Sequence, residues 1–184
     1  MEDPGSILSL NDAEVQVARH LLQASSDGRQ REYMDQAQIS SDLGIEVSEV
    51  QRAVAELVSR GYVERLGVAG TDSPPVRPSK SLFWDLDPYV HGWDPRADAR
   101  TLAKKLVEGS GTGHGRLNTR EFAEQTGWPL RRLNPALHFL VEGAIVRESR
   151  TVVPDVVTLQ IHETEATRSF LAKRYDSDQR RRGA

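Results

Sequence analysis

The chain has 184 residues, of which 38 % are apolar, enough to form one compact domain or two small ones. It contains no cysteine, which excludes disulfides, thiolate metal ligands and cysteine nucleophiles, and its apolar runs are shorter than the roughly 20 residues of a membrane helix. We therefore expect a soluble, globular, cytoplasmic protein that does not enter a membrane.

Charge is unevenly distributed, although 24 basic and 27 acidic side chains nearly balance over the whole chain. Residues 1–90 carry 8 basic and 15 acidic side chains, a net charge of −7, whereas residues 91–184 carry 16 and 12, a net charge of +4. Because Lys and Arg dominate phosphate binding, we expect a polyanion to be attracted to the second half and repelled by the first.

The first predicted elements are three helices, opened by Asn11, Asp35 and Ser48. Each of these capping residues has Glu or Gln three positions later, which is the spacing of a capping box. Gly44 is suited to end the second helix. The alternating segments "YVERLGV" and "SLFWDL", separated by the turn-rich "AGTDSPPVRPSK", then predict a β-hairpin.

The second half repeats this order. Asp94 followed by Pro95 opens a helix, and Asn118 with Glu121 opens another that ends at Gly127. A third helix lies within "PLRRLNPALHFLVEG", and "IVRESRTVV" with "VVTLQIHE" predicts a second hairpin.

The start of that last helix has two interpretations, because proline inside a helix removes a backbone donor. Either Asn134 caps a helix whose first residue is Pro135, or the helix begins near Pro129 and bends. We favour the first, since Asn followed by Pro is typical of a helix N-terminus.

Residues 35–65 align without a gap to residues 118–148, at an offset of 83, and their apolar positions coincide. Three helices with an abrupt turn before the third, followed by a hairpin, resemble the winged helix-turn-helix domains of bacterial transcription regulators. The resemblance covers roughly residues 8–87 and 94–163. It implies a mainly α fold with small β-hairpins: an acidic winged-helix domain in 1–90, and a basic one in 91–184 with a C-terminal helix and a disordered tail.

In such regulators the third helix enters the major groove of double-stranded DNA and the hairpin contacts the backbone or minor groove. The apolar stripe of the second copy's third helix leaves outward Arg131, Arg132, Asn134 and His138. Arg bridges guanine and Asn bridges adenine, so these side chains suit base recognition. Thr119 and Arg120 suit phosphate contact, and Arg147 and Arg150 extend the basic surface along the hairpin.

The corresponding positions in the first copy are Ser48, Gln51 and Arg52, with Arg77 and Lys80 near the hairpin tip. Glu46 and Glu49 lie beside them and repel phosphate, so this face suits weak DNA contact or a protein partner. The leading hypothesis is a DNA-binding transcriptional regulator that reads DNA through the second copy.

The alternative is a structural adaptor whose winged helices dock protein partners in a chromosome-associated, replication or defence assembly. The acidic first half favours it. A short apolar stripe in the C-terminal helix, formed by Ala166, Phe170, Leu171 and Tyr175, is expected to pack back or to form a homodimer contact. The aromatic residues of "SLFWDLDPYVHGWDP" are expected to pack the junction between the copies.

No pattern in the sequence indicates catalysis, so we expect a protein that is not an enzyme and has no cofactor. The five histidines lie in different elements without the spacing of a zinc site, which argues against metal binding. The glycine-rich "GSGTGHGR" follows a helix rather than a strand and lacks the ending of a phosphate loop, so we interpret it as a connection.

Overall fold

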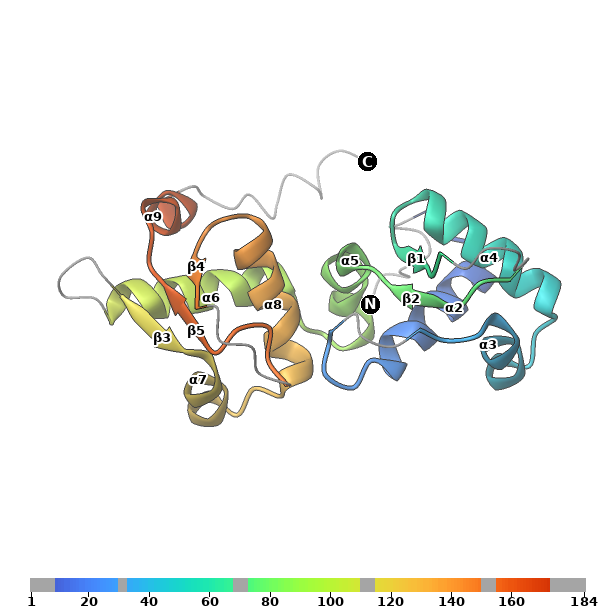
Figure 1. The fold of residues 1–184 in the computed structure, drawn as a ribbon, viewed down its shortest axis with the longest axis horizontal. Helices are drawn as coiled ribbons and strands as arrows, with labels where there is room; N and C mark the ends of the chain where they lie inside the picture. Colours follow the sequence, from blue (N-terminus) through green and yellow to red (C-terminus); the bar gives the residue numbers. More distant parts are fainter. Residues whose placement is uncertain (1–8, 30–32, 68–72, 110–114, 150–154, 173–184) are drawn as a thin grey trace.

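The structure is a computed structural model that describes residues 9–29, 33–67, 73–109, 115–149 and 155–172. It forms two lobes along the long axis of the molecule, each around its own cluster of buried side chains (Figure 1). We call them the N-terminal unit, which contains α2 to α5 with β1 and β2, and the C-terminal unit, which contains α6 to α9 with β3 to β5. The fold is mainly α with two small antiparallel sheets, as the sequence predicts.

The N-terminal unit begins with the three predicted helices. Its elements are α2 (Asp12–Ala24), α3 (Gln36–Leu43), α4 (Val47–Ser59), β1 (Val63–Arg65), β2 (Val76–Pro78) and α5 (Lys80–Val90). Asn11 and Glu14 form the expected capping box at α2, whereas Asp35 makes no side-chain cap bond at α3. Helix α4 starts two residues earlier than predicted, after Glu46 rather than Ser48. Its buried stripe packs against α2 and α3 and forms the core of this unit.

The C-terminal unit has a three-stranded sheet in the order β3-β5-β4. Its elements are α6 (Pro95–Glu108), β3 (Arg116–Asn118), α7 (Thr119–Thr126), α8 (Leu130–Glu142), β4 (Arg147–Glu148), β5 (Gln160–His162) and α9 (Glu165–Ala172). Asp94 caps α6 and Asn118 caps α7, as predicted. Phe170 and Leu171 of α9 pack on the core of the same unit, so this helix folds back on the chain.

Corresponding helices of the two units start 83 residues apart in the chain, which is the offset that aligns the two halves of the sequence. Helices α3 and α7 each have 8 residues, and α4 and α8 each have 13. Both second helices end at a glycine with positive φ, Gly44 at 66° and Gly127 at 68°. An isolated bridge between Met34 and Val76 occupies the place that β3 and β5 have in the C-terminal unit.

Two predictions of secondary structure are wrong. The segment "SLFWDL" belongs to helix α5 rather than to a strand, and Val76–Pro78 supplies the second strand of the hairpin. Ser79 caps α5, whose buried Leu82, Phe83 and Leu86 have helical spacing. Helix α8 begins at Leu130, with Pro129 as its N-cap and Pro135 in its interior, so the favoured start at Pro135 is also wrong.

Helix α5 joins the units: it belongs to the N-terminal core and contacts both α6 and α8 (Figure 1). The indole nitrogen of Trp84 donates a hydrogen bond to the carbonyl oxygen of Pro135 over 3.1 Å, and the Trp84 ring packs edge-on against Phe139. Arg96 pairs with Asp85 across the same junction, at 2.7 Å. The expected packing of aromatic residues at the junction is present for Trp84, and it fixes α8 against α5.

Candidate functional site

Helix α8 carries four of the predicted base-contacting residues, and its surroundings decide whether they face outward. Leu133, Leu137 and Leu140 are fully buried in the C-terminal core, as the periodicity predicts. The opposite side of α8 faces α5 and the 25–29 loop of the N-terminal unit instead of solvent. Arg131 and Asn134, on that side, therefore lie between the units.

Arg131 is buried, with only 7 % of its surface exposed. Its guanidinium donates two hydrogen bonds of 2.7 Å to the two carboxylate oxygens of Asp87 in α5, and it lies 4.7 Å from the centre of the Phe83 ring. A bidentate pair of this kind uses both sides of the guanidinium fork. The prediction that Arg131 faces outward to meet a base is therefore wrong, because its charge is neutralised within the chain.

Asp87 has the lower exposure of the two partners, at 1 %. Burial raises the pKa of its carboxyl group, and the hydrogen bonds and positive charge of Arg131 lower it in part. His91, which follows α5 and stacks on Trp93 at 5.0 Å, has a lowered pKa because it is partly buried and because Arg131 lies near. The junction therefore contains a charge pair whose partners depend on each other.

Arg132 is also paired within the chain, but inside the C-terminal unit. It donates hydrogen bonds of 2.8 and 2.7 Å to the carboxylate oxygens of Asp98 in α6 and lies over the Trp128 ring, 4.1 Å from its centre. The hydrogen bond to Asp98 raises the pKa of Arg132. The side chain is 30 % exposed, so the expected free, outward position of Arg132 is wrong as well.

Asn134 is fully buried and joins three backbone groups. Its side-chain nitrogen donates to the carbonyl oxygens of Asp27, at 2.7 Å, and Asp155, at 3.0 Å, and its oxygen accepts from the nitrogen of Val157 at 3.0 Å. With its donors and acceptor satisfied inside the protein, Asn134 cannot bridge an adenine without leaving this position. Its predicted role as an exposed base reader is wrong.

Gly28 explains how the loop approaches α8 so closely. Its φ is +69°, and a Cβ atom placed on it would lie 2.7 Å from the carbonyl oxygen of Arg131 and 2.9 Å from the Pro135 ring. The carbonyl oxygen of Arg131 accepts no helical hydrogen bond from Pro135, four residues later, because proline has no N–H. Only glycine fits this contact, which closes the junction next to Asn134.

His138 is partly buried at the same junction. Burial and the nearby Lys80 lower its pKa to about 4, so it is neutral at neutral pH. Lys80 of the N-terminal unit pairs with Glu142 of α8. His138 is therefore not the outward base-contacting residue that we expected, and Lys80 is not free near the hairpin tip.

The two phosphate contacts predicted at the start of α7, Thr119 and Arg120, are also bonded within the protein. Thr119 is fully buried, and its hydroxyl donates to the carbonyl oxygen of Thr158 over 2.6 Å, so it is not at hand for a phosphate. Arg120 is exposed but pairs with both carboxylate oxygens of Asp155, at 2.6 and 2.7 Å. Arg147 is exposed on β4, and Arg150 lies outside the described residues.

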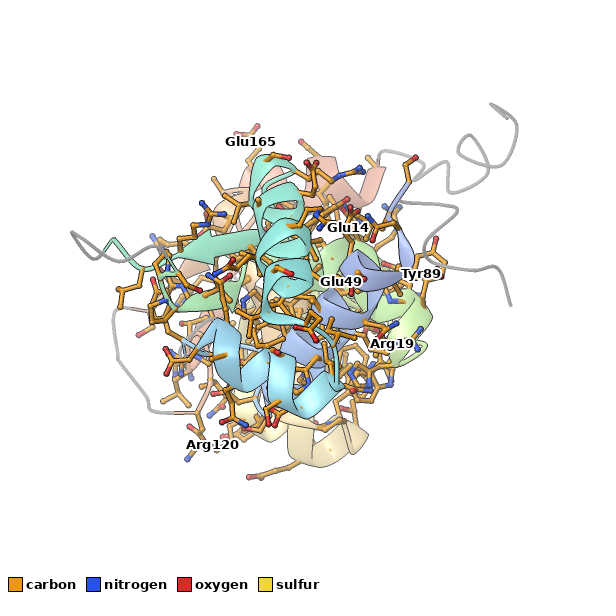
Figure 2. The ribbon with its side chains drawn as sticks, turned by 90° about the vertical axis from the view of Figure 1, so that its right-hand side faces the viewer. Glu14, Arg19, Glu49, Tyr89, Arg120 and Glu165 are labelled. Atoms are coloured by element: carbon orange, nitrogen blue, oxygen red, sulfur yellow. The ribbon has the colours of Figure 1, made fainter. Side chains whose placement is uncertain are left out.

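In the first copy, two of the residues predicted to face outward on the third helix are exposed. Helix α4 faces the viewer in Figure 2, and Ser48 and Arg52 are exposed on it, while Gln51 is half-buried. Arg77, in contrast, pairs with Glu64 at 2.7 Å and lies 4.8 Å from the centre of the Tyr33 ring. The exposed face of α4 also carries the carboxylates of Glu49 and Glu56. Glu46 and Val47 are exposed at its N-terminal end, and Arg60 is exposed at its C-terminal end.

Sequence reasoning missed the acidic partners that neutralise the arginines of α8. Asp87 and Asp98 are 44 and 34 residues away from them in the chain, so no local pattern connects these pairs. A signal was present in α5: the buried residues Leu82, Phe83 and Leu86 have helical spacing after the cap Ser79, which places Asp87 next to the apolar stripe.

The described ranges offer no group of three His, Asp or Glu side chains placed to hold a metal ion. In the same ranges, every helix is too short or too polar to cross a bilayer.

Comparison with known proteins does not assign a family. No family model and no curated protein matches the chain. A solved structure described as a possible transcriptional regulator from Methanosarcina mazei Go1 is 22 % identical, with a TM-score of 0.35, over 56 % of this chain and 82 % of that one. A likeness of that size carries no argument about function, so the function must be argued from the residues.

Proposed function

We propose that this protein is a structural adaptor made of two winged-helix units that docks protein partners, and that it does not read DNA through α8. One observation supports the proposal above all: the side of α8 that a DNA groove would need is occupied by Asp87, by the carbonyl oxygen of Asp27 and by Trp84. Exposing it would break a buried ion pair and a satisfied amide.

The order of elements supports the winged-helix interpretation. Each unit has three helices, the third preceded by a turn at a positive-φ glycine, and then a pair of antiparallel strands. In DNA-binding proteins of this plan the third helix enters the major groove. Here α8 serves as the connection between the units, and α4 is left as the third helix with an open face.

The α4 face is better suited to a protein than to DNA. Glu46, Glu49 and Glu56 lie on the exposed side with Arg52 and Arg60, and Val47 is 39 % exposed. Three carboxylates repel a phosphate backbone, which disfavours DNA on this face, whereas the exposed Val47 and the two arginines are compatible with a protein contact. We place the docking of the protein partner on this face.

Site-specific photo-crosslinking in cells tests the adaptor function. A photoreactive amino acid at Ala55, which is exposed in the middle of α4, is expected to give a protein adduct of one defined mass. The matched control is the same amino acid at Thr101, exposed on α6, which is expected to give none. No protein adduct from Ala55, or an equal pattern from both positions, would contradict the proposal.

A second candidate function is DNA binding by the N-terminal unit, as a regulator. It is favoured by the exposure of Ser48 and Arg52 on α4, where the structure gives neither side chain a partner among the described residues. Under this function Arg52→Ala weakens binding to a cognate DNA by about 1–3 kcal/mol and relaxes sequence preference at one position. A nucleic-acid adduct at Ala55 in place of a protein adduct would favour it over the adaptor.

A further inference from the structure

The outer face of the three-stranded sheet carries a row of basic side chains at one level. In the register of the sheet, Arg116 of β3 lies opposite His162 of β5, and His162 lies opposite Arg147 of β4. Side chains at paired positions point to the same face, with Cβ atoms about 5 Å apart. The three residues therefore form one row across the sheet, about 10 Å long from the spacing of the strands.

The row faces away from the core. Ile161, which precedes His162 and points to the opposite face, is fully buried, and Leu117 packs against the same core. Arg116 and Arg147 are both exposed, and His162 is half-buried between them. Further polar positions of this face are Gln160, in line with His162, and Asn118, which caps α7.

The two arginines differ from those of α8, which pair with Asp87 and Asp98. Within the described ranges, no carboxylate pairs with Arg116 or Arg147, and two acids of the same unit have other partners: Glu163 binds Arg168, and Asp155 binds Arg120. Arg116 and Arg147 lie on either side of His162, so two exposed guanidinium groups share one face of the sheet. Two such groups on one face form an anion-binding strip.

We propose that the outer face of the β3-β5-β4 sheet binds the phosphate backbone of a nucleic acid through Arg116, His162 and Arg147, without reading its sequence. Guanidinium groups bind phosphate oxygens in a bidentate way, and the His162 ring and the Gln160 amide add hydrogen-bond donors for phosphate and sugar. No large apolar side chain lies on the described part of this face, which disfavours insertion into a lipid surface.

This strip is separate from the surfaces discussed above. It lies where β4 begins and β5 ends, at the end of the hairpin opposite to its tip, and on the other unit from α4. The inference does not depend on the adaptor function, because α4 and the strip are tested with different variants. If both hold, the protein connects a partner on α4 to a nucleic acid on the sheet.

Fluorescence anisotropy with a labelled double-stranded DNA of mixed sequence tests the strip. The wild-type chain is expected to bind at low salt, with an affinity that falls steeply as salt is added. Arg116→Ala/Arg147→Ala is expected to weaken binding to all sequences alike and to reduce the slope of log K against log salt by about two. Arg116→Lys/Arg147→Lys keeps both charges and is expected to keep the slope.

The matched control is Lys104→Ala/Lys105→Ala, which removes two exposed positive charges from α6. It is expected to leave the slope close to the wild-type value, and circular dichroism and urea midpoints verify that each variant is folded. An equal loss in the α6 control would overturn the proposal in favour of net charge alone. So would unchanged binding in the arginine variant, or wild-type binding to anionic vesicles or polyglutamate but not to DNA.

Discussion

At the scale of single residues, the protein neutralises arginines that the sequence pattern predicts to be free for a ligand. Arg131 and Arg132 are adjacent in the chain, yet they bind carboxylates in two different helices, Asp87 in α5 and Asp98 in α6. A helical pattern shows which residues oppose the apolar stripe, but it does not show what covers them. Their partners lie too far along the chain for any local pattern to identify.

Arg131→Met is expected to destabilise the protein by about 3–5 kcal/mol near pH 8, because it leaves the buried Asp87 carboxylate without a partner. Removal of Arg131 also removes a cause that lowers the pKa of Asp87, so this pKa rises further. The folded variant then binds a proton that the unfolded chain releases, and the loss of stability shrinks as the pH falls toward 5.

Urea unfolding at pH 8 and pH 5 measures this effect. Asp87→Asn/Arg131→Met, which has no carboxyl at this position, is the control and is expected to lack the shrinking penalty. An Arg131→Met penalty of equal size at both pH values would mean that Asp87 does not titrate in this range.

His138 is expected to give the opposite pH dependence. Its pKa is about 4 in the folded protein, below the ordinary value of 6.5, so the unfolded chain binds a proton that the folded chain does not. The stability that this contributes is present above pH 6.5 and is lost as the pH falls to 4, up to about 3 kcal/mol. His138→Gln is expected to flatten the profile of unfolding free energy between these pH values, and an unchanged profile would contradict the low pKa.

At the scale of elements, the sequence predicts most of the helices but assigns one of them, α5, to a strand. Helix α2 and its capping box, α6 with Asp94 and α7 with Asn118 follow from local chemistry that the chain carries at each start. Helix α5 was predicted as a strand because its apolar residues come in a short, dense run. Such a run does not distinguish a strand from a buried helix.

The same limit affects the candidate site. Periodicity places the leucines of α8 in the core correctly, but whether the opposite side meets solvent depends on where α5 and the 25–29 loop pack. That packing depends on Gly28, whose lack of a side chain admits the backbone of α8. No regular spacing in the sequence distinguishes this glycine from one in an ordinary turn.

Gly28→Ala is therefore expected to cost more than Gly44→Ala, although both glycines have a positive φ close to 67°. Gly44 has open space around it, so its substitution carries only the conformational cost of about 1–2 kcal/mol. Gly28 adds a clash with the Arg131 carbonyl oxygen and the Pro135 ring. Urea unfolding of the two variants measures the difference, and equal costs would contradict a tight junction.

At the scale of the whole molecule, the junction joins two cores that are separate clusters of buried side chains. The connection combines the ion pairs of Arg131 and Lys80 with the packing of Trp84 on α8. The charge difference between the halves, read from the sequence alone, overstates the positive surface of the second half, because several of its arginines are paired.

Asn134 links the two units through its side-chain amide. The amide bonds to the Asp27 carbonyl of one unit and to Asp155 and Val157 of the other. Residues 155–157 lead into β5, so the path of that strand into the sheet is set partly by a loop that precedes it by more than a hundred residues. A displacement of Asp27 would be relayed through one planar side chain to β5. A C-terminal unit expressed by itself would keep the bonds from Asn134 to Asp155 and Val157 and would lose the one to Asp27.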